Sequence, residues 1–139
     1  VEQVLNELRS GTALELEQDP DGATLAPKIS RADAAIDWSQ PASVICRKIR
    51  GFYPWPGCRV RLIDEHESET ARVTLVRARV IERPRDGFAG IIDDLGHIGA
   101  ADAMVEIVEL QPEGKRPMSL KEFCNGHRWT AEMRLESIL

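Results

Sequence analysis

The spacing of apolar positions changes near residue 57, from helical to extended. At the start of the chain, apolar residues recur at helical spacing, at Val1, Val4, Leu5 and Leu8. Ser10-Gly11 is a typical helix end. A helix this short is not stable alone in water. We therefore interpret residues 1–10 as the end of a helix from a missing amino-terminal domain. Residues 11–28 contain Asp-Pro-Asp-Gly and no sustained period, which predicts a linker.

Two further helical signals follow the linker. Ser30 and Asp33 form a weak capping box for one helical turn. Ser39 is a suitable N-cap for a longer helix, in which Pro41 would occupy the first turn and Gly51 would be the left-handed end. The buried stripe of this helix is predicted to consist of Val44, Ile45 and Ile49. Its basic face would consist of Arg47 and Arg50.

The segment between this helix and the first predicted strand is rich in proline and aromatic residues. It reads Phe52-Tyr53-Pro54-Trp55-Pro56-Gly57, which is too proline-rich for a helix or a central strand. We predict a rigid loop in which the aromatic rings, together with Trp38, pack in the core.

The remaining chain is predicted to be mainly extended. Residues 59–63 and 73–81 are rich in branched side chains, and short apolar runs continue at 91–92, 97–98 and 104–110. In the second strand, alternation puts one face at Thr74, Val76, Ala78 and Val80, and the other at Arg77 and Arg79.

Two short helices are predicted near the end of the chain. Ser119 to Glu122 is a capping box whose helix would end at Asn125-Gly126, and residues 130–139 are predicted to form a final helical tail. Several short strands without βαβ alternation favour a small barrel. The predicted fold of residues 29–139 is mainly β with short helices.

Composition is that of one folded domain. The chain has 139 residues, of which 42% are hydrophobic and 29% charged, and it has no apolar run of membrane-spanning length and no recognisable signal peptide. Three widely spaced cysteines argue against a disulfide framework and indicate a reducing compartment.

Charge is distributed unevenly. The net charge is −5, and this excess of acid lies in the first 40 residues. Basic residues form three clusters beyond that point, at residues 47–61, 72–85 and 115–128. Such clusters are often only solvated faces, but three in one small domain favour a shared anionic partner if folding brings them together.

The sequence does not show the residue spacings that are typical of catalytic and metal sites. There is no Gly-rich phosphate loop or Cys-x-x-Cys, and His66, His97 and His127 are far apart, so no metal site is predicted. Asp93-Asp94 is interpreted as a solvated turn and Cys46 as a small core residue. We therefore expect no catalytic residue in this chain.

Five segments carry a resemblance to a known family. They are LAPKIS (25–30), AAIDWSQPA (34–42), IRGFYPWPG (49–57), ELQPEGKRPMS (109–119) and FCNGHR (123–128). In this order they resemble the carboxy-terminal domain of methionyl-tRNA formyltransferases. Two stretches depart from the family pattern, at Phe88-Ala89-Gly90-Ile91 and Ala101-Asp102-Ala103, and these put loop geometry in question more than function.

The resemblance implies an OB-like β-barrel that helps hold initiator methionyl-tRNA. The whole enzyme would transfer a formyl group from 10-formyltetrahydrofolate to the amino group of methionyl-tRNA in translation initiation. Its folate site and catalytic residues would belong to an amino-terminal Rossmann-like domain in cis, so this chain alone is expected to be inactive and to bind no cofactor. We expect a cytoplasmic monomer that does not contact a membrane.

Candidate RNA-binding residues combine motif positions with the local charge pattern. Because the acceptor arm of tRNA is double-helical, we expect contacts to phosphates to dominate, through Lys28, Arg47, Arg50, Lys115, Arg116 and Arg128. Asp37 is expected to tether the linker to the barrel, and Trp38 to pin that junction by burial. His127 stays open between an RNA contact and a structural turn. Pro54, Trp55, Pro56 and Gly57 are interpreted as a structural motif.

Two other functions remain open from the sequence. The same barrel could belong to a sugar-nucleotide formyltransferase, in which the basic clusters would be incidental, or to a stand-alone RNA-binding OB module. The unpartnered helix at residues 1–10 argues against the stand-alone module. A steep salt dependence of tRNA binding would distinguish an RNA-binding domain of either kind from that of a sugar-nucleotide formyltransferase.

Overall fold

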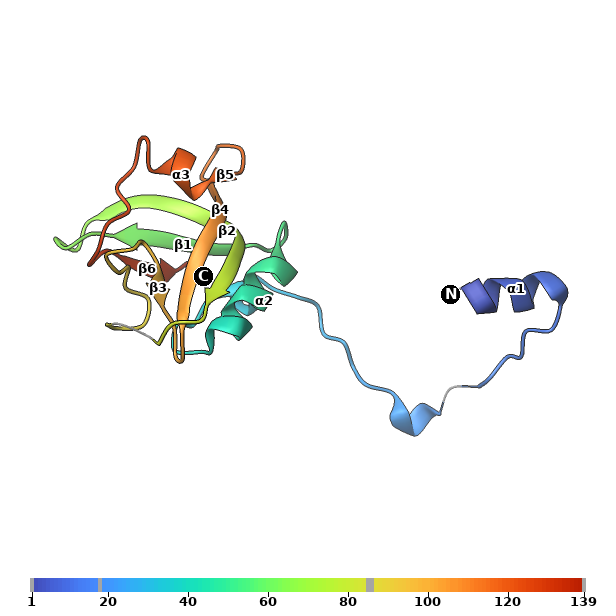
Figure 1. Ribbon diagram of the computed structural model, residues 1–139. Helices are drawn as coiled ribbons and strands as arrows, with labels where there is room; N and C mark the ends of the chain where they lie inside the picture. Colours follow the sequence, from blue (N-terminus) through green and yellow to red (C-terminus); the bar gives the residue numbers. More distant parts are fainter. Residues whose placement is uncertain (1, 18, 85–86, 139) are drawn as a thin grey trace.

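The computed structural model describes residues 2–17, 19–84 and 87–138. The chain starts with helix α1 (Glu2–Ser10), none of whose residues is buried, followed by exposed chain with a single 3-10 turn at Pro20–Gly22. Figure 1 shows this segment apart from the folded body. The body begins at a second 3-10 turn, Ala32–Ala34, where the Asp33 carboxylate accepts hydrogen bonds from Ser30.

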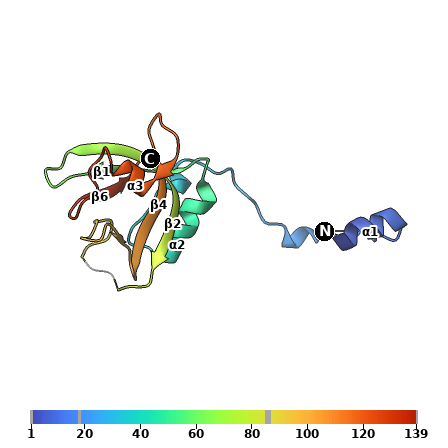
Figure 2. The ribbon, with the colours of Figure 1, turned by 45° about the horizontal axis from the view of Figure 1, so that its top comes forward.

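The body is a bent antiparallel sheet with three short helices in the chain, as the predicted fold class requires. The strands are β1 (Cys58–Ile63), β2 (Glu69–Ile81), β3 (Ile98–Gly99), β4 (Met104–Pro112), β5 (Met118–Ser119) and β6 (Arg134–Ser137). Their order is β3-β4-β2-β1-β6, and β5 pairs with β4. Figures 1 and 2 show the sheet curling so that its two edges approach one another.

Residues 89–92 join the two edges of the sheet. Ala89 and Ile92 bridge to β3, while Ile91 bridges to Arg134 of β6. Backbone hydrogen bonds reinforce both sides, with the Gly90 N–H donating to Gly99 and the Ile92 N–H donating to Met133. Residues 89–92 therefore link β3 to β6 and close the curled sheet into a small barrel.

The barrel core is continuous with the apolar face of helix α2 (Ala42–Phe52). Ile45, Cys46 and Ile49 of α2 are buried in the same cluster as Val60, Leu62 and Leu75 of the sheet. The interpretation of Cys46 as a core residue is confirmed, as is the burial of Ile45 and Ile49, whereas Val44 is only half-buried. Burial of this stripe fixes which face of α2 points to solvent.

Both predicted ends of α2 were wrong. The Ser39 hydroxyl donates to Asp37 instead of capping the helix, whose N-cap is Pro41. The first N–H, that of Ala42, donates to the Asp102 carboxylate, which reaches it from another loop at 2.9 Å. Gly51 is helical, and α2 ends at Phe52 because Pro54 restricts Tyr53 to extended backbone.

The predicted face of β2 was wrong for its first half. Val73 and Leu75 are buried there, and register shifts between Leu75 and Ala78 reverse the alternation, so that Arg77 and Arg79 are exposed as predicted. A bulge adds a residue to one strand, and period 2 then changes face.

The predicted helical tail at 130–139 was also wrong, since β6 is a strand. Met133 and Leu135 are buried, and β6 pairs with β1. Pairing with the free edge of β1 outweighs the local helical preference of this segment. The capping box at Ser119 and Glu122 is confirmed, and helix α3 (Leu120–Phe123) follows it.

Candidate nucleic-acid interface

The outer face of α2 carries two exposed arginines. Arg47 and Arg50 are one helical turn apart and opposite the buried stripe of Ile45 and Ile49, so core packing directs both guanidinium groups to solvent. No carboxylate of the described residues lies within 4.0 Å of either group. Their charges are therefore available to an external anion.

The linker meets the barrel beside this helix. Lys28 is exposed a few residues before the turn Ala32–Ala34, which packs against α2. Lys48 of α2 donates to the backbone oxygen of Ala35, and its Nζ lies 6.0 Å from the Phe52 ring centre. Lys48 thus holds the segment that follows the linker on the helix. Lys28, at the end of the linker, has no carboxylate within 4.0 Å among the described residues.

A second set of cations lies in the turn between β4 and β5. Lys115 and Arg116 are exposed, and the Gln111 side chain fixes the turn by donating to the Lys115 carbonyl at 2.9 Å. Arg116 lies 3.9 Å from Glu122, and Lys115 has no carboxylate partner in the described part of the chain. The pKa of Glu122 is lowered, first by the Ser119 backbone N–H and less by Arg116, so this carboxylate is ionised at neutral pH.

Arg128 does not belong with the other candidates. It pairs with Glu65 at 3.2 Å, in the turn between β1 and β2. This turn lies at the far end of β1 from α2, about 20 Å away for a six-residue strand. The structure therefore places five of the six candidate cations along α2, the linker and the β4–β5 turn, and Arg128 elsewhere beside an acid.

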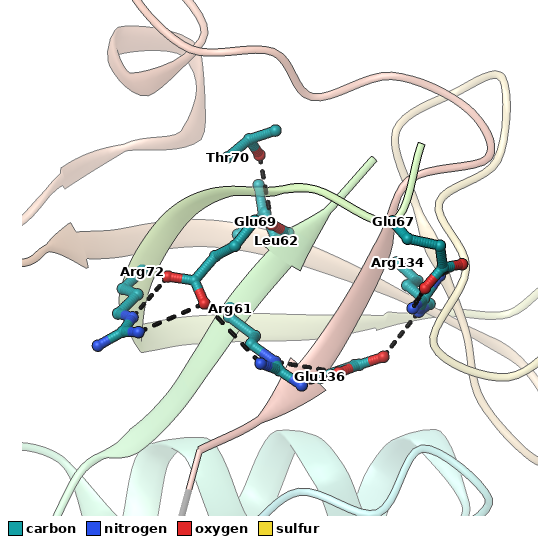
Figure 3. Close-up of polar contacts among 8 residues, drawn as sticks. All are labelled: Arg61, Leu62, Glu67, Glu69, Thr70, Arg72, Arg134 and Glu136. Atoms are coloured by element: carbon teal, nitrogen blue, oxygen red, sulfur yellow. Dashed lines mark hydrogen bonds and ion pairs between the residues drawn. The ribbon is translucent and has the colours of Figure 1, made fainter. Parts of the chain in front are cut away.

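Arginines on the strands are all paired with carboxylates within the described residues. Figure 3 shows a chain of such pairs, in which Glu136 joins Arg61 to Arg134 while Arg72 and Arg61 share Glu69. The remaining strand pairs are Arg59–Glu113, Arg77–Glu109, Arg79–Glu106 and Arg134–Glu67. Arg83, two residues after β2, pairs with Asp93. The second predicted basic cluster, at 72–85, is thus neutralised internally as far as the structure describes it.

The motif residues before α2 shape the junction between linker and barrel. Within the described residues, the Asp37 carboxylate accepts hydrogen bonds only from Ser39 and Gln40, so its expected role as a tether to the barrel was wrong. The tether is instead the Ser137 hydroxyl, which accepts from the Ile36 N–H at 2.8 Å. Trp38 is buried as predicted, and a Cβ on Gly90 would lie 3.0 Å from its ring, so glycine is required where the barrel closes.

The turn after α2 exposes one of its aromatic rings. Phe52 and Tyr53 are half-buried, but Trp55 is 65% exposed, so the prediction that it packs in the core was wrong. Pro54 and Pro56 flank it, and both follow cis peptide bonds. The proline on each side of Trp55 was a signal for a displayed ring that the sequence interpretation missed.

Asp93 and His127, which were also considered from the sequence, both make structural contacts. Asp93 is a largely buried turn residue that pairs with Arg83 and accepts backbone N–H groups, so interpreting it as solvated was wrong. His127 stacks on Phe123 at 4.3 Å between ring centres, which shows a structural contact and leaves an RNA contact open. In residues 2–17, 19–84 and 87–138, no group of three metal-ligating side chains gathers, and no helix is long and apolar enough to cross a membrane.

Comparison with known proteins agrees with this architecture. Curated methionyl-tRNA formyltransferases are similar in sequence: that of Nitrobacter hamburgensis is 37% identical over 118 residues, and that of Cereibacter sphaeroides 41% over 112 residues. These alignments cover 84% and 78% of this chain but 37% and 33% of those proteins. The chain thus spans little more than a third of the length of such relatives.

A solved structure shows the same fold at low sequence identity. The crystal structure of a HypX variant from Aquifex aeolicus aligns with a TM-score of 0.58 and 19% identity, covering 91% of this chain and 23% of that one. A family model described as "Formyl transferase, C-terminal domain" matches residues 28–128. This match includes α2, the barrel strands β1 to β5 and the β4–β5 turn. The chain belongs to the formyl transferase C-terminal domain family.

Proposed function

We propose that this chain is the tRNA-binding carboxy-terminal domain of a methionyl-tRNA formyltransferase. The whole protein then transfers a formyl group from 10-formyltetrahydrofolate to the amino group of initiator methionyl-tRNA, with the chemistry in an amino-terminal domain. The names of the relatives support the reaction, since similar chains are methionyl-tRNA formyltransferases.

One observation carries the assignment of RNA binding to this domain. Arg47, Arg50 and Lys115 are exposed and lie beyond 4.0 Å from every carboxylate in the described residues, whereas the strand arginines are paired. An unpaired guanidinium or ammonium can replace the counterions of RNA phosphates without first losing an internal partner. We name the exposed cations Lys28, Arg47, Arg50, Lys115 and Arg116 the cationic face, in which Arg116 keeps a loose contact with Glu122 at 3.9 Å.

The cationic face is suited to orient an RNA helix. Its members lie on a helix, a linker and a turn, and their side chains are long and solvent-exposed. Phosphate contacts of this kind fix position and orientation without reading base sequence. The acidic residues of the first 40 positions add no attraction, so we expect modest affinity from this chain alone.

The proposal is tested first by binding. Filter binding of the 139-residue chain to initiator tRNA at about 50 and 200 mM salt should show affinity that falls steeply with salt, since each phosphate contact releases counterions. A flat salt response, or no binding at either concentration, would contradict RNA recognition by this domain.

The second test uses the protein that contains this chain. Replacing Lys115 and Arg116 with alanine should raise KM for methionyl-tRNA and flatten its salt dependence, and leave KM for 10-formyltetrahydrofolate unchanged. Unchanged tRNA kinetics in a folded double variant would make these two residues mere solvated surface. Failure of the wild-type protein to formylate methionyl-tRNA would overturn the assigned reaction.

A further inference from the structure

The exposed ring of Trp55 lacks the packing that holds the other two tryptophans. Trp38 is 7% exposed, and Trp129 is half-buried with its indole N–H donating to the Gly96 carbonyl at 2.9 Å. Trp55 is 65% exposed. Burying a tryptophan ring stabilises a fold considerably, so an exposed tryptophan lacks that stabilisation. Tryptophan is also enriched among the residues that dominate the binding energy of interfaces.

The turn holds Trp55 in a defined position. The Gly57 N–H donates to the Phe52 carbonyl at 3.0 Å, which closes residues 52–57 into a compact turn. Pro54 and Pro56 fix their own φ angles on either side of the ring. Gly57 has a φ of +78°, and a Cβ there would lie 3.0 Å from Thr74 Cγ2, so the turn is seated closely on β2.

These contacts place Trp55 between the two parts of the cationic face, namely α2 with Arg47 and Arg50, and the β4–β5 turn with Lys115 and Arg116. The turn follows directly on α2 and Arg50, while Thr74 pairs with Gln111, whose side chain holds Lys115. The start of β1 is also joined to the β4–β5 turn by the pair Arg59–Glu113, at 3.2 Å. Figures 1 and 2 both show the end of α2 and the β4–β5 turn on the same side of the barrel.

We propose that Trp55 stacks on an unpaired base of an RNA bound to the cationic face. This inference rests on the proposed function and adds a contact of a different kind to it. Phosphate contacts cannot use an aromatic ring, but a flat ring among exposed cations matches a nucleic-acid strand, in which anionic phosphates alternate with stacking bases. Within a double helix the bases are occupied by their neighbours, so the partner is a base outside paired RNA.

Stacking and charge contribute to affinity in separable ways. Replacing Trp55 with leucine, which keeps apolar bulk but cannot stack, should weaken tRNA binding by the 139-residue chain about 5- to 100-fold. The slope of log affinity against log salt should stay that of the wild type, because no counterion release is lost. Trp55→Phe, which keeps a ring, should retain most of the affinity.

Fluorescence gives a second and direct readout. Saturating tRNA should quench tryptophan emission of the wild-type chain, and this quenching should disappear in Trp55→Phe while tRNA still binds. Phe88→Ala is the matched control, because Phe88 is 81% exposed on a different loop and should change neither affinity nor quenching.

The outcomes separate this inference from the proposed function. Salt-dependent tRNA binding that is equal in the wild type and Trp55→Leu, or quenching that persists in Trp55→Phe, overturns stacking by Trp55 and leaves the cationic face intact. Absence of tRNA binding by the wild-type chain overturns both.

Discussion

Two surfaces of this small barrel are rich in arginine, and they differ in what surrounds each guanidinium. On the strands, Arg61, Arg79 and Arg134 lie against carboxylates, and the charges cancel locally. On α2, Arg47 and Arg50 face solvent with no carboxylate near them in the described chain. Basic residues in a sequence therefore identify a candidate binding surface only after their internal partners are known, and of these two surfaces the one on α2 keeps its positive charge unpaired within the described residues.

The difference also assigns separate roles in stability. Exposed ion pairs contribute little individually, typically about 0–1 kcal/mol each, but linked pairs hold neighbouring strands in register. Glu136 of β6 and Arg61 of β1 are such neighbours, directly opposite in the strand pairing. The unpaired cations contribute no such contact. Changes that affect folding should thus be separable from changes that affect binding.

The largest expected effect is on folding alone. Gly90→Val adds a branched side chain where φ is +79° and where a Cβ would lie 3.0 Å from Trp38 and 3.4 Å from the Leu135 carbonyl. We expect a loss of about 3 kcal/mol or more of unfolding free energy, measured by chemical denaturation. The fraction that remains folded should bind tRNA as the wild type does. A variant as stable as the wild type would contradict the tight closure of the barrel at Gly90.

A smaller effect is expected where α2 meets the barrel. Asp102→Ala removes the acceptor of the Ala42 N–H, and losing such a cap costs about 1 kcal/mol. Thermal unfolding should show a lower Tm, and Asp94→Ala, an exposed acid in another turn, is the control that should not. An equal Tm for Asp102→Ala and the wild type would mean that water replaces the cap at no cost.

Low pH should weaken the ion pairs on the strands and leave the unpaired cations of α2 unchanged. Hydrogen bonds from Arg134 lower the pKa of Glu67 and of Glu136, where Arg61 adds to the effect, and a hydrogen bond from Arg72 lowers that of Glu69. A carboxyl whose pKa is lower in the folded state contributes stability above its unfolded pKa and loses it as pH falls through the folded value.

Unfolding free energy should therefore decline as the pH is lowered from about 5 to about 3. Glu136→Gln should show a shallower decline over this range, because it cannot form the ionised pair at any pH. Identical pH profiles for the variant and the wild type would show that the Glu136 pairs contribute nothing to acid stability.

The smallest expected effect, on tRNA affinity, comes from a substitution that removes the carboxylate partner of a cation. Glu113→Gln releases Arg59 next to the β4–β5 turn and should tighten tRNA binding about two- to threefold, the size of one exposed charge contact. Glu106→Gln releases Arg79, but it lies about 20 Å along β4 from that turn and should change affinity less. A larger gain from Glu106→Gln would place the RNA on the strands.

Sequence reasoning recovered the local signals and missed those set by distant partners. The capping box at Ser119, the burial of Trp38 and the strands predicted at 59–63 and 104–110 follow from neighbouring residues, and the observed strands β1 and β4 extend these by one and two residues. The strand β6 depends on the free edge of β1, and the start of α2 depends on Asp102, which is 60 residues away from Ala42. Neither partner is visible in a local window.

The candidate site shows the same division. The exposed face of α2 follows from helical spacing, so Arg47 and Arg50 could be selected from the sequence. The pairing of Arg128 with Glu65 joins residues 63 positions apart, and the exposure of Trp55 depends on how its turn sits on β2. These are tertiary contacts, and they cannot be predicted from the pattern of charged or aromatic residues along the sequence.

The central claim is that the unpaired arginines of α2 bind RNA and the paired arginines of the strands do not. Salt dependence of tRNA binding measures it most directly, in Arg47→Ala/Arg50→Ala and in the control Arg77→Ala/Arg79→Ala, which removes the same charge from pairs with Glu109 and Glu106. We predict that the slope of log affinity against log salt shrinks by about 1.5 to 2 in the α2 variant and is unchanged in the strand variant. Equal slopes in both variants, or a change only in the strand variant, would contradict the account.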